Sequence, residues 1–336
     1  MKIIVDAYGG DHAPEEIVKG AIDAVDKDKS LEVVLTGNKE VIDKLVLNYE
    51  RISVVGAPEV ITNDESPTTA VRAKKNSSLV VALNILKSDD EAGGLVSAGS
   101  TGAVLTGAFM ILGRIKGISR PALAPILPTV KGGNVILVDC GANVDTKPEN
   151  LLHFAIMGCA YAKAALNIDN PRVSLLSNGV EEKKGNELNK AAFALLKDSG
   201  LNFVGNMEAR ELISGDYDVV VSDGFDGNIA LKASEGMALG ILTLLKQAIN
   251  KGGIRAKLGA LLLKPALYSL KDTIDYSGKG GAAFLGIEKV IVKSHGSSKA
   301  KSICASILQA KQLAESKIIE KIKSGLTALN NERQDN

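Results

Sequence analysis

Tryptophan is absent from this chain of 336 residues, and aromatic residues together make up only 4% of it. Cysteine is also scarce, since Cys140, Cys159 and Cys304 show neither a C-x-x-C pair nor the spacing of a zinc site. So few, widely separated cysteines predict reduced thiols in a cytoplasmic protein rather than a disulfide framework. No uncharged apolar run reaches the roughly 18 residues that a membrane span requires. We also expect no signal peptide, because the chain begins with a strand-like segment, residues 2–6.

The charges of the chain are balanced. The chain has 40 lysines and arginines and 39 aspartates and glutamates, so its overall charge does not indicate nucleic acid as a partner. Any preference for a charged partner must come from local patches. With 45% hydrophobic and 24% charged residues, the composition is typical of a soluble globular protein with a sizeable core. We expect a single catalytic domain over residues 1–328 and a flexible polar tail over 329–336.

The hydrophobic pattern predicts alternating strands and helices. Five times an all-apolar strand stops at a turn of Asp, Ser, Asn and Gly that starts a helix, as at residues 94–107 and 217–229. Strands that are apolar on both faces indicate a parallel sheet covered by helices on each side. The predicted fold class is therefore α/β, a three-layer α/β/α arrangement with a largely parallel, doubly wound sheet. Its polar turns would meet at the carboxyl ends of the strands, in one crevice where ligands bind.

Long helices are expected at residues 68–87, 148–166 and 298–324, and a helical arm at about 251–276. Residues 251–271 carry five cations and no acid around several leucines, and Pro265 is expected to break this segment into two helices. Cations around leucines suit a surface helix on anionic lipid or a docking site for an acidic protein. A dimer-interface arm whose leucines face a second subunit fits the pattern equally well.

The segment 94–107 is the feature around which the other turns are arranged. Its strand ends at Ser97, and Gly99, Ser100, Thr101 and Gly102 lead into a helix. Small residues let the backbone approach a ligand, and the free N–H groups of a first helical turn favour an anion. The turn therefore predicts a phosphate site. The alternative is a turn that only packs the helix tightly against the sheet.

Two further turns contain groups with possible chemistry. Asp223, Asp226 and Asn228 follow the strand at 217–221, but magnesium would use one or two carboxylates together with substrate phosphates. We favour turn geometry and hydrogen bonding to substrate, and expect no metal and no cofactor. Cys140 follows another strand, yet cysteine is among the residues most often simply buried, so we expect no covalent catalysis through it.

Six stretches, taken in order, resemble the PlsX family of bacterial phosphate acyltransferases. They are VDAYGGDHAP (5–14), SAGSTGA (97–103), DCGAN (139–143), EEKKGN (181–186), SDGFDGN (222–228), and GGAAFLG (280–286) with HGSS (295–298). Each is weak singly, but the ordered set runs from end to end of the chain. The sequence departs from the family at Tyr8, where Met is usual, at Ser100, where Asn is usual, and at residues 175–179, which read LLSNG instead of LLNIG.

The resemblance implies a fold similar to isocitrate and isopropylmalate dehydrogenases and phosphotransacetylase. It also implies a homodimer that transfers a long acyl chain from acyl carrier protein to inorganic phosphate in phospholipid synthesis. The acyl phosphate would then pass to a membrane glycerol-3-phosphate acyltransferase. We therefore expect a cytoplasmic enzyme with peripheral membrane contact through residues 251–271.

The residues agree with this chemistry. Phosphate already carries ionised oxygens near neutral pH, so the reaction requires no protein nucleophile. It requires an anion cradle, donors to the oxyanion and a group that assists departure of the thiol. His12, Lys184 and His295 are the predicted catalytic residues, with a solvated turn, a solvated charge cluster and a helix cap as their respective structural alternatives. The predicted substrate and phosphate ligands are Asp11, Ser97, Gly99, Ser100, Thr101, Gly102, Asn143, Asn178, Asp223, Asn228 and Ser297.

Three other functions compete with this one. A phosphotransacetylase-like enzyme that uses acyl-coenzyme A would share the crevice. A decarboxylating NAD-dependent dehydrogenase is disfavoured, because no G-x-G-x-x-G follows a strand. A non-catalytic scaffold that binds acyl carrier protein and membrane would bind the carrier without turnover.

Overall fold

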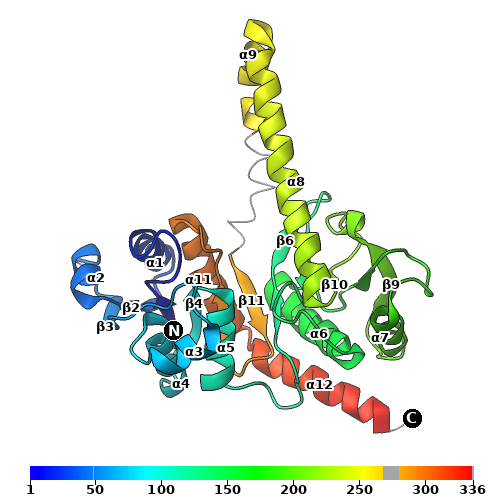
Figure 1. The fold of residues 1–336 in the computed structure, drawn as a ribbon, viewed down its shortest axis with the longest axis horizontal. Coiled ribbons are helices and arrows are strands. Elements are labelled where there is room, and N and C mark those ends of the chain that lie inside the picture. The colour runs from blue at the N-terminus through cyan, green and yellow to red at the C-terminus, as the bar shows by residue number, and fades with distance from the viewer. Residues whose placement is uncertain (48, 268–279, 335–336) are drawn as a thin grey trace.

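The fold is that of a computed structural model, which describes residues 1–47, 49–267 and 280–334. The first part of the chain alternates strands and helices: β1 (Lys2–Asp6), α1 (Glu15–Lys27), β2 (Glu32–Gly37), α2 (Lys39–Leu45), β3 (Ile52–Gly56), α3 (Pro67–Ala73), α4 (Ser78–Ser88), β4 (Ala92–Ser97), α5 (Thr101–Ile111) and β5 (Ala122–Ala124). The middle part contains β6 (Ile126–Pro128), β7 (Asn134–Val138), α6 (Pro148–Tyr161), the π-helix η1 (Ala162–Leu166), β8 (Val173–Ser177), α7 (Glu187–Lys197), β9 (Phe203–Glu208), the 3₁₀ turn η2 (Ala209–Glu211) and β10 (Val219–Val221). The last part contains α8 (Gly224–Lys251), α9 (Gly253–Leu262), β11 (Ala282–Leu285), β12 (Val290–Lys293), α11 (Ala300–Glu315) and α12 (Ile318–Gln334) (Figure 1).

Seven strands form the first sheet, in the order β3-β2-β1-β4-β12-β11-β5. β1 is parallel to β2 and β4, and β4 is parallel to β12, so the carboxyl ends of these strands lie at one edge. Asp6 of β1 pairs with Ser97 of β4, and Ser97 pairs with Lys293 of β12. Three polar residues therefore end three neighbouring strands at the same level.

A second sheet contains five strands in the order β6-β7-β10-β8-β9. The α/β class and its helix-covered, largely parallel sheets are confirmed, but the strands divide between two sheets where the pattern predicted one. The chain crosses from the first sheet to the second at Pro125, which lacks an N–H and cannot donate to a ladder. The sheets stay joined there, because the Cys140 N–H donates to the Leu123 carbonyl at 3.0 Å.

The central strands bury both faces, as the apolar pattern predicted. Ile3 and Val5 of β1 belong to one core with side chains of α1, α6 and α11, whereas Ile4 belongs to a second core with side chains of α4 and α5. Successive side chains of a strand point to opposite faces. Both faces of the sheet are thus covered by helices, and ligands can reach its strands only at their ends.

Several helix boundaries differ from expectation. Residues 68–87 form two helices, α3 and α4, because Lys74 leaves helical conformation (φ −91°, ψ 68°) and Ser77 caps the second helix by accepting the Val80 N–H. The helix expected at 298–324 divides into α11 and α12 at Lys317, which has a left-handed φ of 54°. Since α12 runs to Gln334, the expected tail is helical from 329 to that residue, and residues 335–336 lie outside the described part.

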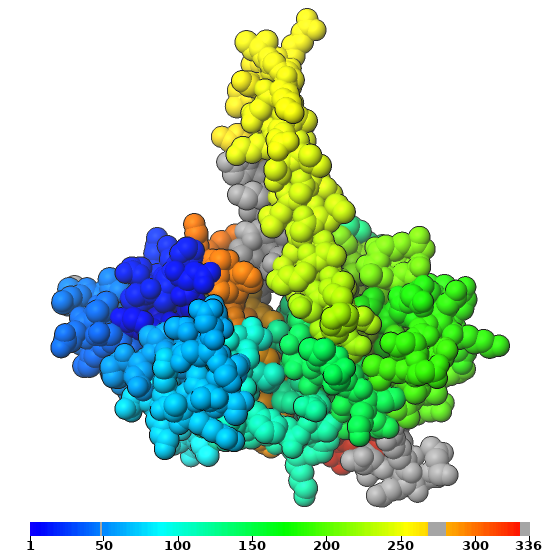
Figure 2. All heavy atoms as spheres, viewed as in Figure 1, coloured from blue at the N-terminus to red at the C-terminus, as the bar shows by residue number. Residues whose placement is uncertain are grey.

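The arm begins earlier than expected. α8 leaves the body and ends next to α9 at the far tip (Figures 1 and 2). Met237, Leu239, Ile241 and Leu244 of α8 are 55–67% exposed. The arm breaks at Gly253, with φ +68°, and again at the turn residue Leu263, which confirms the break expected at Pro265. Residues 268–276 of the expected arm lie outside the described residues.

By length and composition alone, α8 is the one described helix that could cross a membrane, with 6% of its apolar window buried. The sequence predicted no span, and this criterion by itself does not establish insertion.

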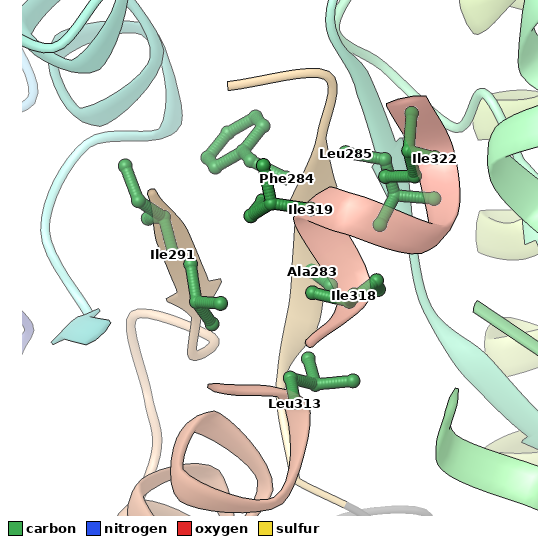
Figure 3. A pocket seen from close by; sticks show the side chains of 9 residues that line it. Ala283, Phe284, Leu285, Ile291, Leu313, Ile318, Ile319 and Ile322 are labelled. Carbon is green, nitrogen blue, oxygen red and sulfur yellow. The ribbon is translucent and has the colours of Figure 1, made fainter. Parts of the chain in front are cut away.

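The last two helices, α11 and α12, pack on strands β11 and β12 of the first sheet. A small cavity lies where α11 and α12 cross β11 and β12, and its nine lining residues are all apolar (Figure 3). Leu313, Ile318 and Ile322 line it from the helices, with Phe284 and Leu285 from β11. It offers no polar group to a ligand and belongs to the core.

Candidate active site

Three turns at the carboxyl edge of the first sheet are in direct contact. The Asp11 N–H donates to the Gly296 carbonyl at 2.8 Å, and the Ser294 N–H donates to the Ser97 carbonyl at 2.9 Å. A Cβ at Gly9 would lie 2.6 Å from the Gly99 nitrogen, so these two turns can approach only because Gly9 lacks a side chain. The predicted meeting of the stretches 5–14, 97–103 and 295–298 is therefore found in the fold.

Asp6 and Ser97 form a buried pair beneath these turns. The Ser97 hydroxyl donates to Asp6 Oδ2 at 2.7 Å and accepts the Gly99 N–H at 3.1 Å. Burial raises the pKa of Asp6, while hydrogen bonds from Ser78 and Ser97 act in the opposite direction. Ser97 was predicted to bind phosphate, but its hydroxyl is engaged by these two partners, so here it shapes the Gly99 turn.

The first turn of α5 keeps its hydrogen-bonding capacity. Ser100 is the N-cap residue and makes no side-chain cap hydrogen bond, and the first helical bond runs from the Val104 N–H to the Ser100 carbonyl. The N–H groups of residues 101–103 therefore have no acceptor within the helix. Ser100, Thr101 and Gly102 are half-buried, so the predicted anion turn combines free donors with access from solvent.

The two predicted catalytic histidines lie in turns at this edge. His12 and Asp11 are exposed between β1 and α1. Neither side chain caps α1, whose N-cap residue is Pro14, and the His12 carbonyl accepts the Glu16 N–H at 3.1 Å. His295 Nδ1 lies 2.8 Å from the Ser297 hydroxyl and accepts the Ser297 N–H at 3.2 Å. Because Nδ1 accepts a hydrogen bond, the ring proton of a neutral His295 lies on Nε2.

His295 and Ser297 do not cap the following helix. The N-terminus of α11 is held by Glu16, which accepts the Ala300 N–H at 2.7 Å, and the N-cap residue Lys299 makes no side-chain cap bond. The helix-cap alternative for His295 is therefore not found. Its ring stays exposed at the carboxyl edge of the sheet.

A second set of turns lies at the carboxyl end of the second sheet. Asp139, directly after β7, is fully buried and accepts hydrogen bonds from Leu123, Ala142 and Asn143. The Asn143 amide donates to Asp139 at 2.9 Å and to the Pro121 carbonyl at 2.7 Å. Both amide hydrogens of this predicted substrate ligand are thus used inside the protein, and a substrate contact by them would require breaking these bonds.

The start of α8 packs tightly on this turn. The Asp223 carboxylate caps α8 by accepting the Asp226 N–H at 2.7 Å, which confirms the turn geometry that we favoured. A Cβ at Gly227 would lie 2.0 Å from the Asp139 carbonyl oxygen. Asn228 is exposed and lies beside Gly141. Within the described residues, no group of three or more His, Cys, Asp and Glu side chains forms a metal site.

Lys184 and Asn178 belong to the loop after β8. The Asn178 side chain accepts the Gly185 N–H at 2.9 Å and so closes the loop. Lys184 is exposed, and in the described part of the chain it forms no ion pair, whereas its neighbours Glu182 and Glu187 pair with other lysines. Lys184 is therefore available for an anionic substrate.

Lys232 of α8 links the two sets of turns electrostatically. Its charge helps to lower the pKa of Lys293 at the end of β12, and it also opposes the increase in the pKa of Cys140 after β7. The polar turns that were expected to meet in one crevice thus form two sets: Gly10 contacts the turn of Gly99, and Gly224 packs on the turn of Gly141. α8 starts in the second set and carries Lys232, whose charge acts on Lys293 of the first set.

The sequence interpretation missed three buried groups: Asp6, Asp139 and Lys293. Each directly follows or ends an apolar run, such as Val290-Ile-Val-Lys293, and an ionisable residue at the end of a buried strand is the signal that was available. Burial raises the pKa of Asp139 and lowers the pKa of Lys293 to about 8. These groups therefore lie in the least solvated part of the site.

Comparison with solved structures identifies the class of fold. The chain resembles a phosphotransacetylase from Streptococcus pyogenes, with a TM-score of 0.63 over 95% of this chain and 94% of that chain, at 18% identity. It also resembles a branched-chain phosphotransacylase from Enterococcus faecalis, with a TM-score of 0.58 over 94% of this chain and 99% of the other, at 15% identity. At these identities the likeness shows the fold alone, and it is the phosphotransacetylase fold that we expected.

Comparison of sequences identifies the family. A family model described as "Fatty acid synthesis protein" matches residues 1–321. A phosphate acyltransferase of Alkaliphilus oremlandii is 48% identical, covering 98% of each chain, and one of Thermoanaerobacter pseudethanolicus is 48% identical, covering 99% of each. The chain belongs to the phosphate acyltransferase family, which confirms the resemblance, and it is an acyltransferase of lipid synthesis.

Proposed function

We propose that this enzyme transfers a long acyl chain from acyl carrier protein to inorganic phosphate and releases the holo-carrier protein. The observation that carries the proposal is the open first turn of α5 beside the joined ends of β1, β4 and β12. The acyl phosphate formed there would be a substrate for a membrane glycerol-3-phosphate acyltransferase in phospholipid synthesis.

The phosphate would lie at residues 99–102. The N–H groups of the first turn of α5 favour an anion through both hydrogen bonding and the helix dipole. Within the described residues, the hydroxyls of Ser100 and Thr101 make no hydrogen bond. Hydrogen bonds to a charged group are worth about 1.5–3 kcal/mol each. Several such donors would hold the phosphate in the orientation that attack on a thioester requires.

The reaction needs no covalent enzyme intermediate. A phosphate oxygen attacks the thioester carbon, the carbon–sulfur bond breaks, and the thiolate takes up the proton that hydrogen phosphate loses. A free thiol has a pKa of about 8.5, so a nearby donor assists its departure. Nε2–H of His295 is suitably exposed, and His12 and Lys184 are further proposed sources of positive charge or a proton.

The arm supports carrier protein as the acyl donor. Residues 251–271 of the arm contain no acid and include Lys251, Arg255, Lys257 and Lys264, and a cationic surface complements an acidic carrier protein. Leu261, Leu262 and Leu263 are 59–83% exposed, which also suits contact with anionic lipid or with a second subunit of a homodimer. We accordingly propose a cytoplasmic location with peripheral membrane contact.

The test mixes purified protein, long-chain acyl carrier protein and phosphate, and measures hydroxylamine-sensitive acyl phosphate together with free carrier thiol. Both products should appear in equal amounts, and only when phosphate is present. The fold shared with phosphotransacetylases favours one alternative, which a parallel reaction with acetyl-coenzyme A examines. Turnover of acetyl-coenzyme A but not of acyl carrier protein would select that alternative, and carrier binding without turnover would select a scaffold.

A further inference from the structure

Lys293 is a buried ammonium group whose hydrogen-bonding capacity is only partly used. The residue is 8% exposed, and Nζ donates to the carbonyl of the adjacent residue, Ser294. Within the described part of the chain, no carboxylate lies within ion-pair distance of this Nζ. An ammonium carries three donors, and a buried charge is costly unless it is paired. This arrangement calls for an anion from outside the chain.

The charges around Lys293 define where such an anion would lie. Asp6 of β1 and Asp11 of the following turn favour the ammonium form from beyond ion-pair distance, whereas Lys232 of α8 disfavours it. Lys232 itself is half-exposed and pairs with Glu235 at 2.8 Å. The charge of Lys232 on α8 therefore acts against that of Lys293 on β12, and an anion beside Lys293 would offset this repulsion.

The position of Lys293 matches the phosphate turn. Lys293 pairs with Ser97 across neighbouring parallel strands, and Ser97 lies three residues before the N-cap of α5. Side chains at the same level of parallel strands share a face of the sheet, so Lys293 and Asp6 end the strands on either side of β4, whose own end leads into the turn of residues 99–102.

We propose that the Lys293 ammonium contacts the substrate phosphate and supplies the positive charge that binds it next to the first turn of α5. The inference deepens the proposed function and rests on its phosphate site. Burial lowers the pKa of Lys293 to about 8, so the group is still charged at pH 7 and loses its charge as the pH rises through 8. Asp6, Asp11 and Lys232 are the charged groups that set this range.

The test compares Lys293→Met with Lys293→Arg and with Lys289→Met, which removes a lysine just before the other end of the same strand. In the acyl carrier protein assay, Lys293→Met should raise KM for phosphate at least tenfold and leave KM for the acyl carrier protein unchanged. Lys293→Arg should recover part of the loss, and Lys289→Met should match wild type. An unchanged KM for phosphate in folded Lys293→Met would overturn the proposal.

Binding of inorganic phosphate alone separates this inference from the proposed reaction. Phosphate should raise the Tm of wild type and Lys289→Met but not of Lys293→Met, whether or not acyl phosphate is formed. If wild type makes no acyl phosphate yet shows this pattern, the reaction is wrong and the Lys293 site stands. If all three proteins respond to phosphate equally while wild type forms acyl phosphate, the site is wrong and the reaction stands.

A measurement on wild type covers the case in which Lys293→Met does not fold. KM for phosphate should rise as the pH increases through about 8, because Lys293 loses its charge there. Inorganic phosphate itself ionises just above neutral pH, so KM is expressed for the phosphate dianion, and its remaining change with pH reports on the protein. A flat profile between pH 7 and 9.5 would contradict the assignment.

Discussion

The hydroxyl of Ser97 donates a 2.7 Å hydrogen bond to the carboxylate of Asp6, and the two residues end neighbouring parallel strands. The same hydroxyl accepts the N–H of Gly99 at 3.1 Å. One buried side chain therefore joins the edge of the sheet to the turn that begins α5. The geometry of this turn, which is the proposed phosphate site, therefore depends on the pair as well as on its glycines.

Ser97→Ala should destabilise the protein by about 1–3 kcal/mol, because it removes one hydrogen bond from the buried Asp6 carboxylate and takes away the acceptor of the Gly99 N–H. Urea unfolding followed by circular dichroism measures the loss. Ser100→Ala is the matched control, because Ser100 makes no side-chain cap bond, and its midpoint should stay near that of wild type. Equal midpoints for the two variants would show that the Ser97 bonds contribute nothing.

Two glycines of α8 should respond in opposite ways to alanine. A Cβ at Gly227 would lie 2.0 Å from the Asp139 carbonyl oxygen, whereas nothing lies within 4 Å of one at Gly236. Gly227→Ala should therefore prevent α8 from packing on the Asp139 turn and yield little folded protein. Gly236→Ala should stabilise the helix by about 0.5–1 kcal/mol. Soluble yield and thermal unfolding distinguish the two, and a well-folded Gly227→Ala would contradict this packing.

Local signals were sufficient to predict the turns. Residues 99–102 lead into α5 as expected, because small residues after an apolar strand are a local signal for a turn that starts a helix, although Asp6 and Gly9 of another segment help to fix its geometry. Lys293 was missed, since its burial depends on the register of β12 against β4. The role of Asn143 was missed for a similar reason, because its partners Asp139 and Pro121 come from separate segments.

The division into two sheets also depends on contacts distant in sequence. β5 and β6 are separated only by Pro125, yet they belong to different sheets. A proline between two short apolar runs is compatible with either a bend within one sheet or a crossing to another. The breaks at Lys74 and Lys317 had no Gly or Pro signal, so two helix pairs were predicted as single helices.

The ion pair between Asp28 and Lys311 should make stability depend on acid pH. Lys311 and Ser30 lower the pKa of Asp28 to about 2, below its value of about 3.9 in an unfolded chain. A lowered carboxyl pKa stabilises the fold above the unfolded pKa, and this contribution is lost as the pH falls through about 2.

Lys311→Met should therefore cost on the order of 1 kcal/mol at pH 7, a modest loss because Asp28 is 28% exposed and screened by water. The difference from wild type in urea unfolding should shrink as the pH falls from 4 to 2. Lys29→Met is the control, because Lys29 forms only an exposed pair with Asp26. A difference that stays constant down to pH 2 would rule out the Asp28 pair as its source.

Cys140→Ala should retain most acyltransferase activity. Burial, followed by the charge of Asp139, raises the pKa of Cys140 well above its usual value, and the protonated thiol is a poor nucleophile. Iodoacetamide at pH 7 should leave Cys140 unlabelled in the folded protein, as mass spectrometry of its peptides would show. Loss of turnover in the variant, together with a trapped acyl-enzyme in wild type, would reverse this conclusion.

A change at the tip of the arm tests whether its leucines contact lipid or a second subunit. Leu261 and Leu263 are 64% and 59% exposed, and a double change to Glu removes apolar area while placing acids among the cations of the arm. We expect this variant to lose cosedimentation with vesicles that contain anionic lipid. Val130→Glu, a change at a 75% exposed residue outside the arm, should bind vesicles like wild type. If vesicle binding persists while the sedimentation coefficient falls, the leucines face a second subunit and the membrane role of this tip is wrong.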